Sequence, residues 1–174
     1  CAMGWKLDKS HSEVGFSVRH MMISKVRGKF TDYDAEVELD PARLESLAVK
    51  ASVDVASITT GEAQRDGHLK SPDFFDAAKY PKMTFHSTGA KVSGSELSLS
   101  GELTIAGRTQ PVVLHGEVLG PSKDPWGMQR VGFSLTGELD REDFGLTWNQ
   151  ALEAGGVLVG KKVALSLEVE LVAG

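Results

Sequence analysis

The side chains that could do chemistry are few and scattered along this chain of 174 residues. Its five histidines (His11, His20, His68, His86 and His115) stand singly, and no two have the spacing of a zinc-ligand pair. There is no Gly-x-Ser-x-Gly elbow, no glycine-rich phosphate loop and no His-Glu-x-x-His motif. We therefore expect no catalytic residue, no metal and no cofactor. The alternative is a small-molecule enzyme that uses His20 with His115 or His68.

Cationic side chains gather at two places that lack strand-like patterning. Arg65 and His68, with Asp66 between them, precede Phe74 in the sequence, and Arg141 begins another irregular stretch. One interpretation is an ion-paired cap that fastens a helix to the rim of the fold. The other is a site for a ligand head group, because a guanidinium matches the geometry of a phosphate.

The elements that must position these groups are strands. In residues 12–20, Val14, Phe16 and Val18 alternate with polar residues, which predicts a strand with one apolar face. His20 continues the apolar parity, so we expect it to point into the interior. There it is either a hydrogen-bonded core histidine or a donor to a ligand head group.

The same alternation predicts about eight to nine strands and one helical excursion, residues 62–79. Thr60 or Ser57 would cap its first helix, and a second would begin at Pro72. A change of parity near Thr31 and Asp32 predicts a β-bulge. The further predicted strands are residues 26–39, 47–55, 83–87, 90–92, 97–105, 112–119, 131–139 and 163–171.

One apolar face per strand indicates antiparallel sheets, and the fold could be a sandwich or a barrel. We prefer a single barrel over residues 1–174, because the predicted bulge and the glycines within the strands suit strong coiling. Val113 and Leu167 are also assigned to the interior. The residues predicted to line an internal tunnel are Phe16, Val18, His20, Phe30, Val49, Val53, Phe85, Leu99, Leu103, Phe133, Leu135, Phe144, Trp148 and Leu165.

Composition limits the partners. The net charge of −5 argues against nucleic acid and against an anionic membrane surface. The chain has no apolar run long enough to span a membrane, so we expect no stable membrane insertion. Cys1 is the one cysteine, which excludes an intrachain disulfide and a thiolate metal site. The chain as given favours the cytoplasm. A removed leader would make it periplasmic or secreted, and a native Cys1 would be typical of a lipoprotein.

An ordered set of motifs adds a resemblance to these inferences. The motifs are Phe-Ser-Val-Arg-His (16–20), Val-Arg-Gly-Lys-Phe (26–30), Ala-Ser-Ile-Thr-Thr-Gly (56–61), Arg-Asp-Gly-His-Leu-Lys-Ser-Pro-Asp-Phe-Phe-Asp (65–76), Tyr-Pro-Lys-Met-Thr-Phe (80–85), Gly-Glu-Leu-Thr-Ile-Ala-Gly (101–107) and Asp-Arg-Glu-Asp-Phe-Gly-Leu (140–146). Over roughly residues 5–172 the chain resembles the YceI-like family of bacterial proteins. The resemblance implies a lipocalin-like, eight-stranded antiparallel barrel that binds a polyisoprenoid or another long amphiphile, and it implies a homodimer.

Three functions remain open on the sequence alone. The first is non-catalytic binding, storage or transport of a lipophilic molecule such as an isoprenoid quinone or a prenyl phosphate. Its tail would lie in the tunnel, and its head group would lie near Arg65, His68 and Arg141. The second is a fully packed barrel that acts as a dimeric interaction protein. The third is the histidine-based enzyme, which requires polar groups to converge in a cavity.

Overall fold

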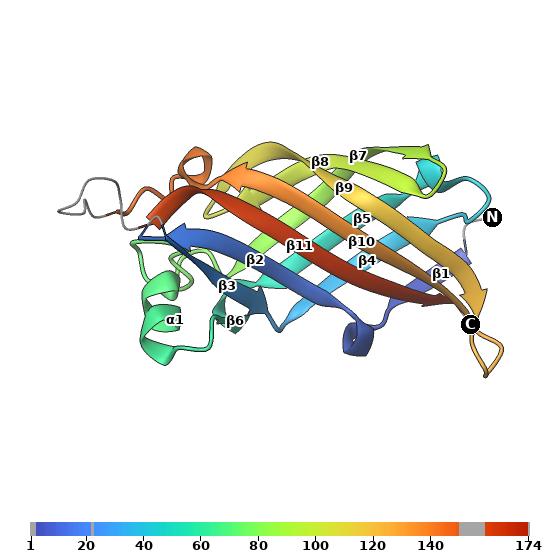
Figure 1. The fold of residues 1–174 in the computed structure, drawn as a ribbon, viewed down its shortest axis with the longest axis horizontal. Helices are drawn as coiled ribbons and strands as arrows, with labels where there is room; N and C mark the ends of the chain where they lie inside the picture. The colour runs from blue at the N-terminus through green and yellow to red at the C-terminus, as the bar shows by residue number, and fades with distance from the viewer. Residues whose placement is uncertain (1–2, 22, 150–158, 174) are drawn as a thin grey trace.

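The computed structural model describes residues 3–21, 23–149 and 159–173, so Cys1 lies outside the described residues. These residues form one antiparallel sheet that closes on itself, with a short helix at one end (Figure 1). The strands are β1 (Met3–Leu7), β2 (Glu13–His20), β3 (Ser24–Phe30), β4 (Tyr33–Leu39), β5 (Ala48–Asp54), β6 (Ile58–Thr59), β7 (Lys82–Ser93), β8 (Glu96–Ile105), β9 (Arg108–Lys123), β10 (Gln129–Asp140) and β11 (Val159–Ala173). The helix is α1 (Ala63–Lys70), and the 3-10 turns are η1 (Lys9–His11), η2 (Leu44–Ser46), η3 (Val55–Ser57) and η4 (Arg141–Phe144).

The pairing order makes this sheet a barrel of eight strands. β3 pairs with β2, and β4 pairs with β5, so β3 and β4 act as two halves of one wall strand. The other wall strands follow in the order β5, β7, β8, β9, β10, β11 and β2. β1 pairs with both β4 and β11 and closes the wall at the end opposite α1. The predicted antiparallel barrel with a short helical insertion is confirmed.

The change of parity at Thr31 and Asp32 is a break, and the predicted bulge in one continuous strand is wrong. Both residues lie outside the strands, between the end of β3 and the start of β4. Their backbone groups bond instead to the segment around η3: Thr31 N donates to Ser57 O at 3.3 Å, and Asp54 N donates to Asp32 O at 2.9 Å. Phe30 and Tyr33, on either side of the break, are both buried, so the two halves keep their apolar faces inward.

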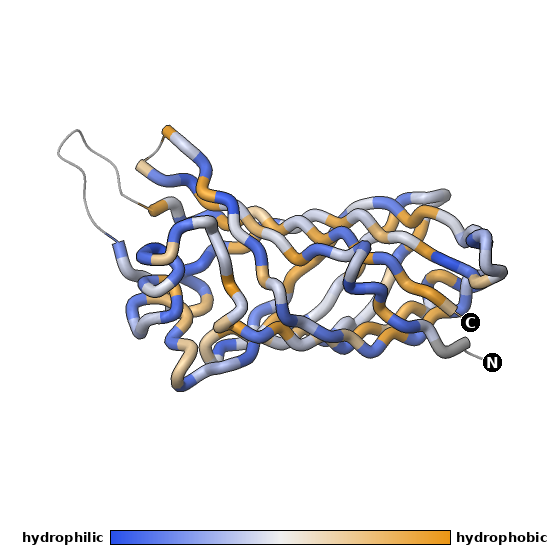
Figure 2. The backbone as a smooth tube through the Cα atoms, turned by 90° about the horizontal axis from the view of Figure 1, so that it is seen from below, coloured by the Kyte–Doolittle hydropathy of each residue, from blue (hydrophilic) through white to orange (hydrophobic). Residues whose placement is uncertain are grey.

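Alternation of apolar and polar residues along the wall is plain in Figure 2. In β9, however, the assignment of Val113 to the interior is wrong. Val113 is 42% exposed, whereas Val112 and Leu114 on either side are buried. Apolar residues occupy both parities of this strand, so the pattern alone could not tell its two faces apart.

The helical excursion holds one helix, α1, and the predicted second helix from Pro72 is wrong. The segment after α1 folds into turns in which Asp76 N donates to Ser71 O and Ala77 N donates to Lys70 O. Asp76 has a φ of 50°, in the left-handed region, which a continuing helix does not contain. The predicted caps are also wrong, because α1 begins after Glu62, which makes no side-chain capping bond. No helix among the residues described here is long and apolar enough to cross a bilayer.

Candidate functional site

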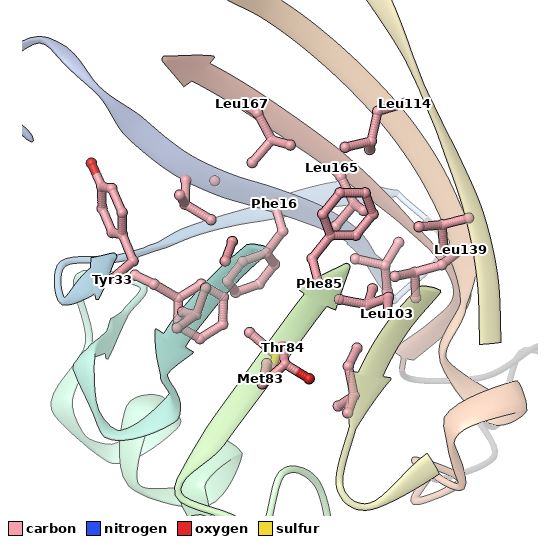
Figure 3. A pocket seen from close by; sticks show the side chains of 18 of the residues that line it. Phe16, Tyr33, Met83, Thr84, Phe85, Leu103, Leu114, Leu139, Leu165 and Leu167 are labelled. Atoms are coloured by element: carbon pink, nitrogen blue, oxygen red, sulfur yellow. The ribbon is translucent and has the colours of Figure 1, made fainter. Parts of the chain in front are cut away.

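A cavity of about 360 Å³ lies inside the barrel, with side chains from nearly every wall strand around it (Figure 3). The strand registers explain the lining. Phe16 on β2 faces Leu165 on β11 on one side and Gly28 on β3 on the other. On the neighbouring part of the wall, Ala35 of β4 lies beside Ala51 of β5. The small residues leave open the space that larger side chains would fill. The alternative of a fully packed barrel is therefore wrong.

Glycines set how closely the aromatic rings approach the wall. A Cβ at Gly28 would lie 2.4 Å from Cζ of Phe16, and one at Gly101 would lie 2.5 Å from the ring of Phe85. Each ring thus lies over a glycine on the neighbouring strand. Only residues without a side chain allow these rings to lie flat along the inner surface.

The predicted tunnel residues line this cavity with one exception. Phe144, on η4, is absent from the lining and is 2% exposed. It packs with Val55 and Ile58 in the apolar cluster at the α1 end. Its assignment to the tunnel is wrong, because η4 carries it into this cluster at the end of the barrel. The predicted residues found in the lining are Phe16, Val18, His20, Phe30, Val49, Val53, Phe85, Leu99, Leu103, Phe133, Leu135, Trp148 and Leu165.

Several lining residues were missed, and most share the parity of those that were named. Val14 and Val26 flank the predicted set on β2 and β3, whereas Leu114 on β9 was missed because the adjacent Val113 was assigned to the interior. Strict use of alternation would have found the first two. Alternation could not identify Phe75, because this residue lies in the turns after α1 and not on a strand. Its ring contacts that of Phe30, with the centroids 6.0 Å apart.

Arg141 is the most deeply buried charged group of the described chain, with 3% of its surface exposed. Its guanidinium donates to three carbonyl oxygens: Gly160 O at 2.8 Å, Leu146 O at 2.6 Å and Val159 O at 3.2 Å. It also lies over the ring of Phe74, 5.9 Å from the centroid. Burial lowers the pKa of Arg141 below its ordinary value. The guanidinium holds the end of the barrel together and presents a cation to the cavity.

Arg65 and His68 also line the cavity, but their described partners belong to the surroundings of α1. Arg65 donates through Nε to Thr60 Oγ1 at 2.7 Å, and its Nη1 lies 3.5 Å from Glu62. His68 Nε2 lies 2.9 Å from Asp73 Oδ2. These contacts favour the structural interpretation, in which the two residues fasten the helix at the rim.

Aromatic rings gather around His68 at this end of the barrel. The ring of Trp148 lies 4.7 Å from that of His68 and 5.4 Å from that of Phe74, measured between centroids. Trp148 was predicted to line the tunnel, and it lines the cavity here with Arg141 and His68. The α1 end of the cavity thus carries cations among its aromatic rings, whereas aliphatic and aromatic side chains line the rest.

The histidines do not converge inside the barrel. His20 lines the cavity, but His115 is exposed on β9, and its Nδ1 lies 3.0 Å from Ser98 Oγ. The expectation that His115 could meet His20 is wrong, because β9 turns this residue outward. His68 is engaged with Asp73, so the arrangement that the enzyme hypothesis needs is absent from the described residues.

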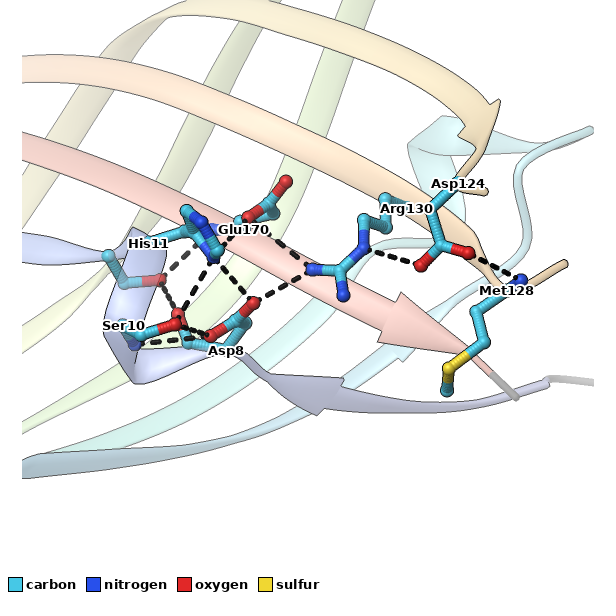
Figure 4. Close-up of polar contacts among 8 residues, drawn as sticks. Asp8, Ser10, His11, Asp124, Met128, Arg130 and Glu170 are labelled. Atoms are coloured by element: carbon cyan, nitrogen blue, oxygen red, sulfur yellow. Dashed lines mark hydrogen bonds and ion pairs between the residues drawn. The ribbon is translucent and has the colours of Figure 1, made fainter. Parts of the chain in front are cut away.

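Among these residues, one group has the composition of a metal site, and it lies outside the cavity (Figure 4). Asp8, His11 and Glu170 meet beside η1, where Arg130 enters the group. Arg130 Nη1 lies 2.8 Å from Asp8 Oδ2, and its Nε lies 2.8 Å from Asp124 Oδ2. A guanidinium already neutralises these carboxylates, so the group is an ion-pair network that ties η1 to β10 and β11.

The charges of this network shift the pKa values of its members. Hydrogen bonds from Ser10, His11 and Arg130 hold the pKa of Asp8 well below its ordinary value. The hydrogen bond to Asp8 raises the pKa of His11, and Arg130 lowers that of Asp124. The ionised network is therefore favoured near neutral pH.

A closed antiparallel barrel with an apolar cavity and cations at one end defines the chain as a barrel of the ligand-binding class. The model of the YceI-like domain matches residues 5–171, and the chain belongs to this family. A relative from Staphylococcus aureus, the UPF0312 protein SAS2572, is 40% identical over 164 residues, which cover 94% of each chain.

Two solved structures share the fold. BcnA from Burkholderia cenocepacia aligns with a TM-score of 0.82 at 23% identity and covers 95% of this chain and 99% of its own. A polyisoprenoid-binding domain from Saccharophagus degradans aligns with a TM-score of 0.67 at 15% identity and covers 99% of both chains. At these identities the similarity shows the architecture alone.

Proposed function

We propose that this protein is a non-catalytic carrier or store of a long-chain isoprenoid. The tail lies in the barrel, and the head group lies at the α1 end. The observation that carries the proposal is the polarity of the cavity: its body is aliphatic and aromatic, and cations collect at one end. The polyisoprenoid-binding domain of similar fold supports the choice of ligand class.

The tail needs no polar partner. Each methylene moved from water into such a cavity contributes about 0.8 kcal/mol. The walls offer side chains such as Val49, Leu103 and Leu165, which contact a hydrocarbon without directional demands. An apolar tail of matching width therefore binds through contact area, and tails of differing chemistry are tolerated.

The head group is selected by charge. Arg65 and Arg141 line the cavity, and Asp34 is the one carboxylate in the described lining. The three described hydrogen bonds of Arg141 all go to neutral carbonyls, so no carboxylate is hydrogen-bonded to its charge. A buried guanidinium that is hydrogen-bonded only to neutral carbonyls is stabilised more by an anionic oxygen than by a further neutral one. This favours a prenyl phosphate over a prenyl quinone.

Native mass spectrometry of protein purified from its own host tests the proposal. A stoichiometric long-chain adduct that is lost on denaturation is expected. Delipidated protein would then be titrated with a prenyl phosphate, a prenyl quinone and a prenyl alcohol of equal tail length. The phosphate should bind most tightly. A clean apo mass that none of the three ligands changes would overturn the carrier function. Equal affinities would overturn the head-group assignment alone.

The same measurement addresses the homodimer that the resemblance implies. The dimer remains a prediction, and native mass spectrometry reads it directly as a doubled mass. Binding in the barrel interior does not require it, because the walls of the cavity all come from one chain.

A further inference from the structure

The β2–β3 hairpin carries an exposed apolar turn at the α1 end of the barrel. Ile23 is 81% exposed and Met21 is 44% exposed, so both side chains face solvent. Met21 also has a φ of 54°, a backbone conformation that is costly for a residue with a side chain. Figure 2 shows this turn projecting beyond the wall at the same end as α1. Residue 22 lies outside the described residues.

The hairpin behind this turn is strongly basic, although the whole chain has a net charge of −5. The charged residues between Val14 and Thr31 are all basic: Arg19, Lys25, Arg27 and Lys29. Alternation puts Val18 and Val26 against the cavity and leaves Arg19, Lys25 and Arg27 exposed. The excess of positive charge is therefore local to this hairpin and lies on its outer surface.

Among the described residues, the cations nearest the turn have no carboxylate partner. Arg19 lies directly opposite Lys25 in the β2–β3 register, and like charges in that position destabilise a ladder. Within the described part of the chain, no carboxylate oxygen lies within 4.0 Å of Arg19, Lys25 or Arg27. Lys29 differs, because Glu13 lies 3.9 Å from its Nζ. An anionic partner would relieve the repulsion between Arg19 and Lys25.

The spacing of these groups suits a flat, anionic surface with an apolar layer beneath it. Lys25 and Arg27 follow Ile23 by two and four residues, or roughly 7 and 13 Å along a strand. When the turn enters the apolar layer, the headgroups lie between Ile23 and the rest of the hairpin, so Lys25 and Arg27 are both within about one Debye length of them. His20, which precedes the turn, lines the cavity, so the surface would adjoin this end of the ligand site.

We propose that the β2–β3 hairpin docks the barrel on an anionic lipid bilayer. Met21 and Ile23 enter the interface, and Arg19, Lys25 and Arg27 contact the headgroups. The docking is peripheral, since one apolar turn buries too little to insert the protein permanently. It goes beyond the proposed ligand binding and does not depend on it. Its role would be to bring the α1 end of the cavity to the membrane, where long isoprenoids dissolve.

The experiment is flotation of the full chain with two vesicle types, pure phosphatidylcholine and a 7:3 mixture of phosphatidylcholine and phosphatidylglycerol. Binding to the anionic vesicles is expected, with loss at high salt and little binding to the neutral ones. Lys25→Gln with Arg27→Gln should weaken partitioning about thirtyfold, from about fivefold for each cation at the surface. Ile23→Ser should weaken it about tenfold.

Matched controls lie on surfaces away from this hairpin. Lys91 and Lys123 are exposed on β7 and β9, and Lys91→Gln with Lys123→Gln removes the same charge. Trp126 is 80% exposed in the β9–β10 turn, so Trp126→Ser removes an apolar side chain of similar exposure. Both control variants should bind as the parent does. All the substituted residues are exposed, and unchanged thermal unfolding confirms that each variant is folded.

Three results would overturn the proposal. The parent protein could fail to bind anionic vesicles. The controls could lose binding as much as the hairpin variants do, which would assign docking to general charge or to Trp126. Sedimentation could show a dimer that Ile23→Ser dissociates, without vesicle binding, which would make the hairpin an interface between two copies of the chain. Because no isoprenoid is added, each result is independent of the ligand assignment.

Discussion

Gly28 lies directly opposite Phe16 across the β2–β3 ladder, and the ring of Phe16 occupies the space where a side chain at Gly28 would be. Replacement by alanine would put Cβ 2.4 Å from Cζ of the ring, so the ring must swing away from the wall. The adjoining space is the cavity, which Phe16 lines. The shape of the binding site therefore depends on this one residue without a side chain.

Gly28→Ala should narrow the cavity and lower the free energy of unfolding by about 1–3 kcal/mol, as overpacking does. Urea unfolding and isoprenoid titration measure the two effects. The matched control is Gly15→Ala on β2, where the new Cβ would meet nothing closer than the Gly28 oxygen at 3.5 Å. Unchanged stability and affinity in Gly28→Ala would show that the ring has room to move elsewhere.

Ala51→Leu should reduce ligand affinity without unfolding the barrel. Ala51 lines the cavity beside Ala35, so a leucine there extends into open space. We expect about four- to fifteenfold weaker binding, because the added carbons exclude about one or two methylenes of the tail, each worth about 0.8 kcal/mol. Stability should be unchanged or higher, since filling a cavity commonly adds about 0.5–2 kcal/mol.

The control for Ala51→Leu lies on the same strand. Ala48 is exposed on the outer face of β5, so Ala48→Leu adds the same side chain outside the barrel. Its affinity should equal that of the parent protein. If Ala51→Leu also binds normally, the tail does not reach this part of the cavity.

The wall of the barrel was accessible from the sequence because a period of two defines an inner and an outer face. Phe16, Val18 and Phe133 were assigned to the interior on parity alone, and the structure places all three around the cavity. The rule failed where both parities are apolar. In β9, Val112, Val113 and Leu114 follow one another, and only the register against β8 and β10 tells which of them face inward.

The ends of the barrel were less accessible, because long-range contacts define them. Asp76 has a left-handed φ, which ends the helical conformation after α1, but nothing in the sequence distinguishes it from the other aspartates in turns. Phe144 and Trp148 are four residues apart in one irregular stretch, yet Phe144 packs in the core and Trp148 lines the cavity. The network joins Asp8 to Arg130 and Glu170, which are both more than 100 positions away from it, and no spacing rule finds such a group.

Arg141→Met should separate the structural role of this residue from its role toward a ligand. The change removes a charge and the hydrogen bonds to the carbonyls of Leu146, Val159 and Gly160, of which Val159 O keeps the bond from Asn149 Nδ2. The free energy of unfolding should therefore fall by at least about 2 kcal/mol. Under the proposed function, it should also abolish the preference for a prenyl phosphate over a prenyl alcohol of equal length. The ratio of the two dissociation constants measures this preference independently of stability.

Arg141→Lys is the companion variant, because it keeps the charge with fewer donors. It should restore much of the preference for phosphate while recovering only part of the stability. A preference that survives in Arg141→Met would contradict head-group binding by this residue. The role of Arg141 would then be to hold η4 against β11.

The network beside η1 should make stability depend on pH on both sides of neutrality. The pKa of His11 is raised above 6.5, so its contribution is complete below about pH 6.5 and is lost as pH rises through the raised value. The pKa of Asp8 is lowered from 3.8, so its contribution is present above that value and is lost as pH falls further. Glu170 and Arg130 also face His11, with opposite effects on its pKa. The two contributions overlap between about pH 4 and 6.5.

His11→Gln should remove the alkaline limb of this dependence. The melting temperature of the parent protein should fall between about pH 6 and 8 by more than that of the variant, because only the parent loses a proton from this network. His86→Gln is the control, since His86 is exposed on β7 at a distance from η1 in the fold. Equal slopes for the parent protein and His11→Gln would mean that the ion pairs of His11 with Asp8 and Glu170 do not persist in solution. Arg130 alone would then neutralise the two carboxylates.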